Sequence, residues 1–136
     1  MMLIDTTVLV DVLRDASGAN GRRLLAVLQS EDVAFTRFTE LEILAGARDD
    51  ADWGSIQAYL ASETLLEPIA GSWSGAARIY FDLRRAVRTV RKVIDCCIAQ
   101  IALERNVTLL HNDRDFETIA TVRPLKHVRL QLASSP

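Results

Sequence analysis

The sequence contains few of the residues that mark special classes of protein. Six glycines and three prolines among 136 residues are too few for a fibrous or low-complexity chain. Only two residues are cysteine, Cys96 and Cys97. Because these cysteines are neighbours, they can neither form an ordinary disulfide with each other nor complete a zinc site by themselves. Nothing in the cysteine content therefore requires an oxidising compartment.

Two further absences concern membranes and overall charge. The N-terminus, residues 1–5, lacks the basic and long apolar segments of a secretion signal, and no apolar run elsewhere is long enough to span a membrane. The formal net charge is −2, which argues against a chain that coats nucleic acid through its overall charge. We therefore expect a cytoplasmic protein with no membrane partner, in which any contact with nucleic acid is local.

The composition that remains is typical of one compact domain. With 49% hydrophobic and 25% charged residues, residues 1–136 are expected to form a single domain that buries a substantial core. Short apolar runs predict strands at 2–4, 33–36, 107–111 and 128–130, with 65–69 as an edge strand. Helical periodicity predicts helices at 8–14, 20–28, 38–46, 53–60, 72–87, 95–104 and 116–120, the second of them capped by Asn20. This alternation predicts an α/β fold with a parallel sheet covered on both faces.

Four acidic residues lie at the ends of these expected elements. Asp5 follows the first strand and Asp113 follows the strand at 107–111. Glu42 lies beyond the end of the second strand, and Asp95 opens the helix at 95–104. Ligands of open α/β sheets bind beyond the carboxyl ends of the strands. With right-handed crossovers, we expect all four carboxylates to converge at one edge of the sheet.

Each acid alone also fits a structural role as a helix cap or a turn residue. As a group they favour a site, because Asp5 and Glu42 lie in apolar segments where an unpaired carboxylate is costly to bury. Helical spacing places Glu42 on one face with Phe38 and Ala45, which we expect to point inward and to leave Glu40 more exposed. Carboxylates held close together raise one another's pKa unless a cation lies between them. The group therefore predicts a site for Mg²⁺, with Mn²⁺ as a substitute, and such a site suits phosphodiester hydrolysis.

Basic residues are concentrated in the segment that precedes Asp95. Between residues 78 and 92 the single acid is Asp82, and six side chains are basic: Arg78, Arg84, Arg85, Arg88, Arg91 and Lys92. Such a segment is either an ordinary solvated helix face or a surface that holds a nucleic-acid backbone or a protein partner. We expect contacts from Arg84, Arg85, Arg88, Arg91 and Lys92. Arg91 and Lys92 are favoured because they lie just before Asp95.

Four segments, taken together, resemble a known family. They are Asp5-Thr6-Thr7, Glu42-Ile43-Leu44-Ala45-Gly46, Asp95-Cys96-Cys97-Ile98-Ala99 and His111-Asn112-Asp113-Arg114-Asp115-Phe116. In this order and spacing, across essentially the whole chain, they resemble the PIN domain, in particular the VapC toxins of bacterial type II toxin–antitoxin modules. The resemblance implies a three-layer α/β/α sandwich with a parallel sheet, and an Mg²⁺-dependent endoribonuclease. It also implies a structured RNA substrate such as tRNA or rRNA, a homodimer, and inhibition by a cognate antitoxin.

The resemblance also implies roles for individual residues. By motif match, the catalytic acids would be Asp5, Glu42, Asp95 and Asp113. Asp5 and Asp95 would be the direct metal ligands, and Glu42 and Asp113 would be further ones. Thr6 would orient a carboxylate or a metal-bound water, and Asp115 would position water or a second ion.

Two positions depart from the usual pattern of the family. Thr7 stands where serine is usual, which preserves the hydroxyl group. His111 stands where threonine or serine is common, at the mouth of the expected site. There its imidazole would contact RNA or support a ligand, or it would be an ordinary residue at a strand end.

Other functions fit the pattern less well. A phosphatase of the haloacid-dehalogenase type needs a second Asp two residues after the first, where this chain has Thr7. A phosphorylatable receiver domain needs an acidic pair after the first strand and an acceptor Asp after the third, and neither is evident. The remaining alternative is a non-catalytic PIN module that binds RNA or a protein partner. The presence of all four acids favours the nuclease.

Overall fold

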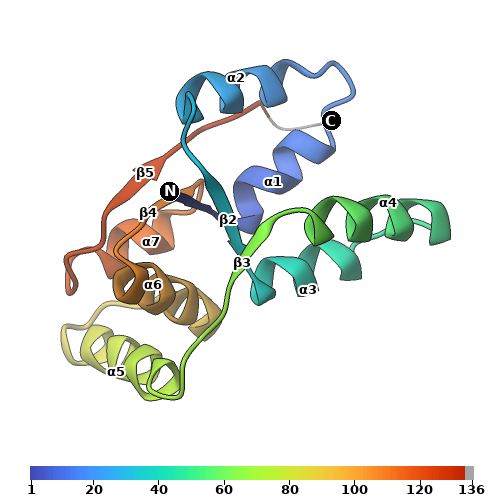
Figure 1. Ribbon diagram of the computed structural model, residues 1–136. Coiled ribbons are helices and arrows are strands. Elements are labelled where there is room, and N and C mark those ends of the chain that lie inside the picture. The colour runs from blue at the N-terminus through green and yellow to red at the C-terminus, as the bar shows by residue number, and fades with distance from the viewer. Residues whose placement is uncertain (134–136) are drawn as a thin grey trace.

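The computed structural model describes residues 1–133 and contains a five-stranded, all-parallel sheet (Figure 1). Residues 134–136, which belong to the expected single domain, lie outside the described residues. The strands are β1 (Met2–Ile4), β2 (Val33–Thr36), β3 (Thr64–Leu66), β4 (Thr108–His111) and β5 (His127–Arg129), in the order β3-β2-β1-β4-β5.

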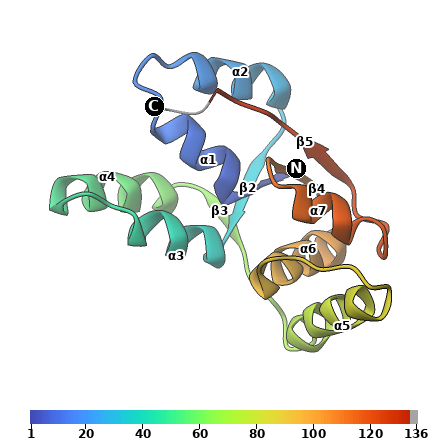
Figure 2. The same cartoon turned by 180° about the vertical axis from the view of Figure 1, so that it is seen from behind.

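Seven helices in the described part of the chain cover the two faces of the sheet (Figures 1 and 2). One layer comprises α1 (Thr6–Leu13), α2 (Ala19–Leu28), α3 (Arg37–Ala45) and α4 (Asp50–Ala61). The other comprises α5 (Ser72–Arg85), α6 (Val93–Arg105) and α7 (Arg114–Ile119). Among residues 1–133, no helix combines the length and apolar character needed to cross a bilayer.

Two apolar clusters, one on each face, hold the layers together. Successive side chains of a strand point to opposite faces, so Leu3 packs in the cluster with α5–α7 while Met2 and Ile4 pack in the cluster with α1–α4. Because both faces of these strands are covered, successive residues are apolar, which is the pattern from which the strands were predicted. The expected α/β/α sandwich is confirmed.

Helices α1, α4, α6 and α7 begin two or three residues earlier than expected, and the expected cap of α2 is wrong. The cap of α2 is Gly18, whose φ of +76° suits glycine, whereas Asn20 lies inside the helix and is buried. The Asn20 amide donates to the carbonyl oxygens of Asp11 and Ala133, so it ties α2 to the C-terminal segment. Helix α6 begins at Val93, which places Asp95 in its first turn rather than at its cap.

The strand order positions the site. From β1 the chain adds β2 and β3 on one side, then crosses to add β4 and β5 on the other. The connections therefore diverge between β1 and β4, which is where ligands of open α/β sheets bind. Asp5 follows β1 and Asp113 follows β4 by two residues, so the topology brings these residues to the same edge.

Candidate active site

An acidic cleft of about 330 Å³ lies beyond the carboxyl ends of β1 and β4. Its lining contains all four acids singled out in the sequence, which come from four separate parts of the chain. The lining residues are Asp5, Thr6, Thr7, Val10, Asp11, Glu42, Lys92, Asp95, Asn112 and Asp113.

Asp5 is buried, with 3% of its surface exposed, and caps α1. Its Oδ2 accepts hydrogen bonds from the backbone N–H of Thr7 (3.1 Å) and from the Thr7 hydroxyl (2.6 Å). The same hydroxyl oxygen accepts the backbone N–H of Asn112 (3.0 Å), so Thr7 links the ends of β1 and β4. Burial raises the pKa of Asp5, in spite of these donors. Thr7, for which the sequence predicts no such role, therefore positions Asp5, whereas the Thr6 hydroxyl binds a different carboxylate, that of Glu42.

Asp95 is the acid with the least support from the protein. Its Oδ2 is the only buried side-chain nitrogen or oxygen without a hydrogen-bond partner in residues 1–133. Burial, together with the charges of Asp5, Asp113 and Asp115, raises its pKa to about 7. On the same helix face, Ala99 and Ala102 are buried. A buried carboxylate oxygen without a donor is costly and therefore indicates an external cation.

Asp113 and Asp115 share one counter-ion, Arg91. Asp113 caps α7 by accepting the backbone N–H of Asp115 (2.9 Å), and both of its oxygens accept Nη2 of Arg91 at 2.9 Å. Oδ2 of Asp115 accepts the backbone N–H of Arg91 (3.0 Å) and its Nε (3.2 Å). Sequence spacing gives no signal for these pairs, because the partners lie more than 20 residues apart.

Glu42 lies at the rim of the cleft. Its Oε1 accepts the Thr6 hydroxyl (3.0 Å), and its Oε2 lies 3.6 Å from Nζ of Lys92. The expected burial of this face is wrong: Ala45 is exposed, and the Glu42 and Glu40 side chains are 30% and 33% exposed. The buried face of α3 instead carries Thr39 and Ile43, one helical turn apart.

His111 does not lie at the mouth of the cleft, so the expected contact with RNA is corrected. Its side chain is fully buried beneath the cleft and packs on Phe116. Its Nδ1 accepts the backbone N–H of Asp113 (3.1 Å), which leaves Nε2 to donate to Nδ1 of His127 (3.0 Å). Burial, followed by the neighbouring His127, lowers the pKa of His111 to about 4. His111 therefore supports the loop that carries Asp113.

The basic segment divides into two parts. Lys92 lines the cleft, and Arg91 binds two of its acids. Arg84 and Arg85, at the end of α5, lie instead over the rings of Tyr80 and Phe81. The exposed Arg88 lies in the loop that joins α5 to α6.

The donor set fits a hard divalent cation. Oxygens of Asp95, Asp113 and Asp115 all lie within 4.8 Å of one another, and Asp5 faces the same cleft. Carboxylate oxygens are the ligands that Mg²⁺ and Mn²⁺ prefer. The buried Oδ2 of Asp95, which accepts no hydrogen bond, is a ligand atom that such a cation would satisfy. Asp115, which we expected only to position water or a second ion, thus lies close enough to Asp95 and Asp113 to be a ligand itself.

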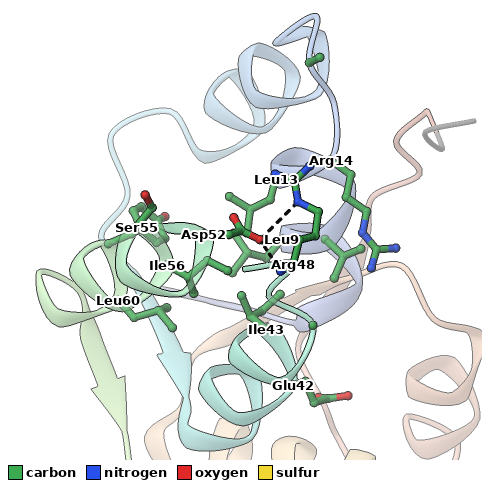
Figure 3. A pocket seen from close by; sticks show the side chains of 14 residues that line it. Leu9, Leu13, Arg14, Glu42, Ile43, Arg48, Asp52, Ser55, Ile56 and Leu60 are labelled. Carbon is green, nitrogen blue, oxygen red and sulfur yellow. Dashed lines mark hydrogen bonds and ion pairs between the residues drawn. The ribbon is translucent and has the colours of Figure 1, made fainter. Parts of the chain in front are cut away.

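A second hollow, of about 770 Å³, adjoins the acidic cleft (Figure 3). Its walls come from α1, α3 and α4 and are mainly apolar, with Leu9, Leu13, Ile43, Ile56 and Leu60 among its lining. Glu42 and Val10 line both hollows. This apolar groove therefore leads directly to the acids.

Comparison with known proteins identifies the family. The PIN domain model matches residues 2–122. Ribonuclease VapC11 of Mycobacterium tuberculosis is 35% identical over 130 residues, which cover 93% of this chain and 96% of that protein. Ribonuclease VapC51 of the same organism is 31% identical over 120 residues, which cover 88% and 85% of the two chains.

Solved structures show the same fold. The structure of DNA-bound VapBC from Salmonella typhimurium contains a chain with a TM-score of 0.75 and 18% identity, and the match covers 94% of this chain and 96% of that one. A chain of VapBC2 from Rickettsia felis, also bound to DNA, has a TM-score of 0.74 and 18% identity, with coverages of 96% and 98%. Given the family model and the relatives above 30% identity, this chain belongs to the PIN-domain family and, within it, to the VapC ribonucleases.

Proposed function

We propose that this protein is the toxin of a toxin–antitoxin module, an Mg²⁺-dependent endoribonuclease that cuts structured RNA such as tRNA or rRNA in the cytoplasm. The observation that carries the proposal is the unpartnered Oδ2 of Asp95, buried among carboxylates that no protein cation fully balances. A chain built only for binding has no need of such an unfavourable arrangement.

The proposed ligands are the acids at the centre of the cleft. Asp5 and Asp95 would hold the ion directly, and Asp113 and Glu42 would complete the ligands or orient its waters. A bound Mg²⁺ ion supplies a water of lowered pKa and neutralises charge that develops on the scissile phosphate. Thr7 holds Asp5 in place and Thr6 holds Glu42, so both carboxylates are oriented before the ion arrives. Asp115, held by Arg91, would position an attacking water or a second ion.

The basic residues would bind the RNA backbone. Lys92 lies at the cleft and is the best placed to contact the phosphate next to the scissile bond. Arg84, Arg85 and Arg88 would contact phosphates farther along the RNA, which supports affinity rather than chemistry. Arginine guanidinium groups over Tyr80 and Phe81 are compatible with this role, because stacking leaves their N–H groups available.

The decisive experiment is cleavage of total tRNA and rRNA by the purified chain without antitoxin. The reactions would contain Mg²⁺, Mn²⁺ or EDTA, beside Asp5→Asn and Asp95→Asn variants checked for folding by circular dichroism. We expect discrete fragments that require the ion and both acids. Equal cleavage by wild type and variants would contradict the site.

The second candidate is a PIN module that binds RNA or a protein partner without cleaving it. The exposed basic residues favour this reading equally well. Absence of cleavage under every metal, combined with measurable binding of tRNA or rRNA, would support it.

We propose that a cognate antitoxin covers the apolar groove of Figure 3, where an amphipathic segment would reach Glu42 and the acids. The groove is apolar and continuous with the cleft, which supports this occupant. Leu13→Glu, in the groove, should weaken binding of the co-expressed antitoxin by roughly tenfold or more. Leu25→Glu is the matched control, because this leucine is similarly exposed on α2 outside the groove. Equal binding by the two variants would contradict the assignment.

We further propose a homodimer that pairs through the surface around Trp73 and Leu41, both more than half exposed. Phe38, one turn from Leu41, contacts the Trp73 ring, so this surface spans α3 and α5. Light scattering should show a dimer in the wild type and a monomer for Trp73→Glu. If Trp73→Glu is still a dimer, the interface does not lie at this surface.

A further inference from the structure

The contacts of Arg91 are unusual for so exposed a side chain. Its guanidinium group binds Asp113 and Asp115 through three hydrogen bonds, although the side chain is 74% exposed. The two acids are almost buried, with side-chain exposures of 10% and 11%. Arg91 therefore enters the acidic group from the solvent side and covers two of its members.

The bonds of Arg91 conflict with metal binding. The oxygens it occupies belong to two of the three acids whose ligand atoms lie within 4.8 Å of one another. Oδ1 of Asp113 also accepts the backbone N–H of Asp115, whereas the only hydrogen bond to Oδ2 in residues 1–133 comes from Arg91. Oδ2 is thus the Asp113 oxygen that an ion would take most easily. A guanidinium group and a divalent cation on the same oxygen repel each other and compete for its lone pairs, so each weakens the binding of the other.

We infer that Arg91 is an internal counter-ion that exchanges with the divalent cation. In the metal-free protein its guanidinium group neutralises Asp113. When the ion binds, the guanidinium group leaves both Asp113 and Asp115 and turns to the RNA backbone. This inference rests on the proposed function, and it makes Arg91 a positioning residue whose RNA contact depends on the ion.

Two features of the structure favour the exchange. The backbone N–H of Arg91 donates to Asp115 independently of the side chain, so Asp115 stays in place after the guanidinium group leaves. The acids also outnumber the cations seen against them: six carboxylates line or adjoin the cleft, and Arg91 and Lys92 form ion pairs with three of them, Asp113, Asp115 and Glu42. Replacing one positive charge at Asp113 by two reduces this imbalance.

Calorimetric titration with Mn²⁺, in the absence of RNA, tests the competition without relying on activity. Arg91→Gln should bind Mn²⁺ more tightly than wild type, by about fivefold or more. Arg91→Lys keeps the charge but loses the planar fork, so its affinity should fall between the two. Arg78→Gln is the matched control, because it removes an arginine paired with Asp82 on α5, outside the cleft, and should leave the affinity unchanged. Circular dichroism would confirm that every variant is folded.

A second measurement on the wild type follows the displacement itself. The Nε–H signal of Arg91 in a ¹⁵N NMR spectrum, assigned by its loss in Arg91→Lys, should shift on titration with Mg²⁺. Weaker or unchanged Mn²⁺ binding by Arg91→Gln, or an unmoved signal at saturating Mg²⁺, would overturn the exchange and leave the metal site standing. Absence of Mn²⁺ binding by wild type and Arg91→Gln alike would overturn the metal-dependent function itself, and the exchange with it.

Discussion

A carboxylate lies near each end of α6, and the two carboxylates differ in how many hydrogen bonds the protein gives them. At the C-terminal end, Glu104 accepts hydrogen bonds from the Ser72 hydroxyl (2.7 Å) and the Gln100 amide (2.9 Å). At the N-terminal end, Asp95 has an oxygen without a donor, and burial together with three nearby acids raises its pKa. A satisfied carboxylate stabilises the fold, whereas an unsatisfied one is kept where a ligand completes it.

The largest effect is expected from a substitution of Asp95. Asp95→Asn should lower metal-dependent cleavage on the order of 10²–10³-fold and weaken Mn²⁺ binding, because a direct ligand is lost. In the metal-free protein the same change should raise the Tm, because it removes a buried charge with no partner. RNA cleavage and a thermal melt in EDTA measure the two effects. A lower Tm would mean that the Asp95 charge is satisfied after all.

Protonation of Asp95 should also make stability and Mn²⁺ affinity depend on pH. The folded pKa of Asp95, about 7, lies above its ordinary value of 3.8, so the native state binds the extra proton between these pH values. Metal-free stability should therefore fall as pH rises from about 4 to about 7, and then level off. Mn²⁺ affinity should move the other way and fall about tenfold for each pH unit below 7, since the ion requires the carboxylate. In Asp95→Asn, the contribution of Asp95 to the pH dependence of stability and of Mn²⁺ affinity should disappear. Thermal melts and Mn²⁺ titrations at several pH values would show this.

At the other end of α6, Ser72→Ala should affect stability alone. It removes the hydroxyl that accepts the backbone N–H of Ile69 (2.9 Å) and donates to Glu104, at a cost of roughly 1–3 kcal/mol in the free energy of unfolding. Urea denaturation measures this loss. Mn²⁺ affinity should stay at its wild-type value, and a change in it would show that the two ends of α6 are coupled.

The smallest expected effect concerns the support of Asp5. Thr7→Val keeps the shape of the side chain but removes the hydroxyl that binds Asp5 and Asn112, so cleavage should fall roughly tenfold. Thr7→Ser, which keeps the hydroxyl, should retain near wild-type cleavage. Equal losses in the two variants would point to packing rather than to the hydrogen bonds.

The sequence alone predicted the layers of the fold and four of the acids that line the cleft, but not Asp11, which lines it too. Apolar runs such as Met2-Leu3-Ile4 predict buried parallel strands because both faces of such a strand are covered. Acids placed just beyond strand ends, as Asp5 and Asp113 are, meet at one edge because parallel strands share their direction.

Which cations neutralise those acids is visible only in the tertiary structure. The pairing of Arg91 with Asp113 and Asp115 joins a loop to a distant helix, and the burial of His111 depends on Phe116 and His127. Glu42 lies at the rim because the buried face of α3 is set by the elements that pack against the helix, and not by the periodicity of its sequence. Sequence spacing reports contacts within an element, whereas charge compensation and burial depend on atoms brought together from different elements.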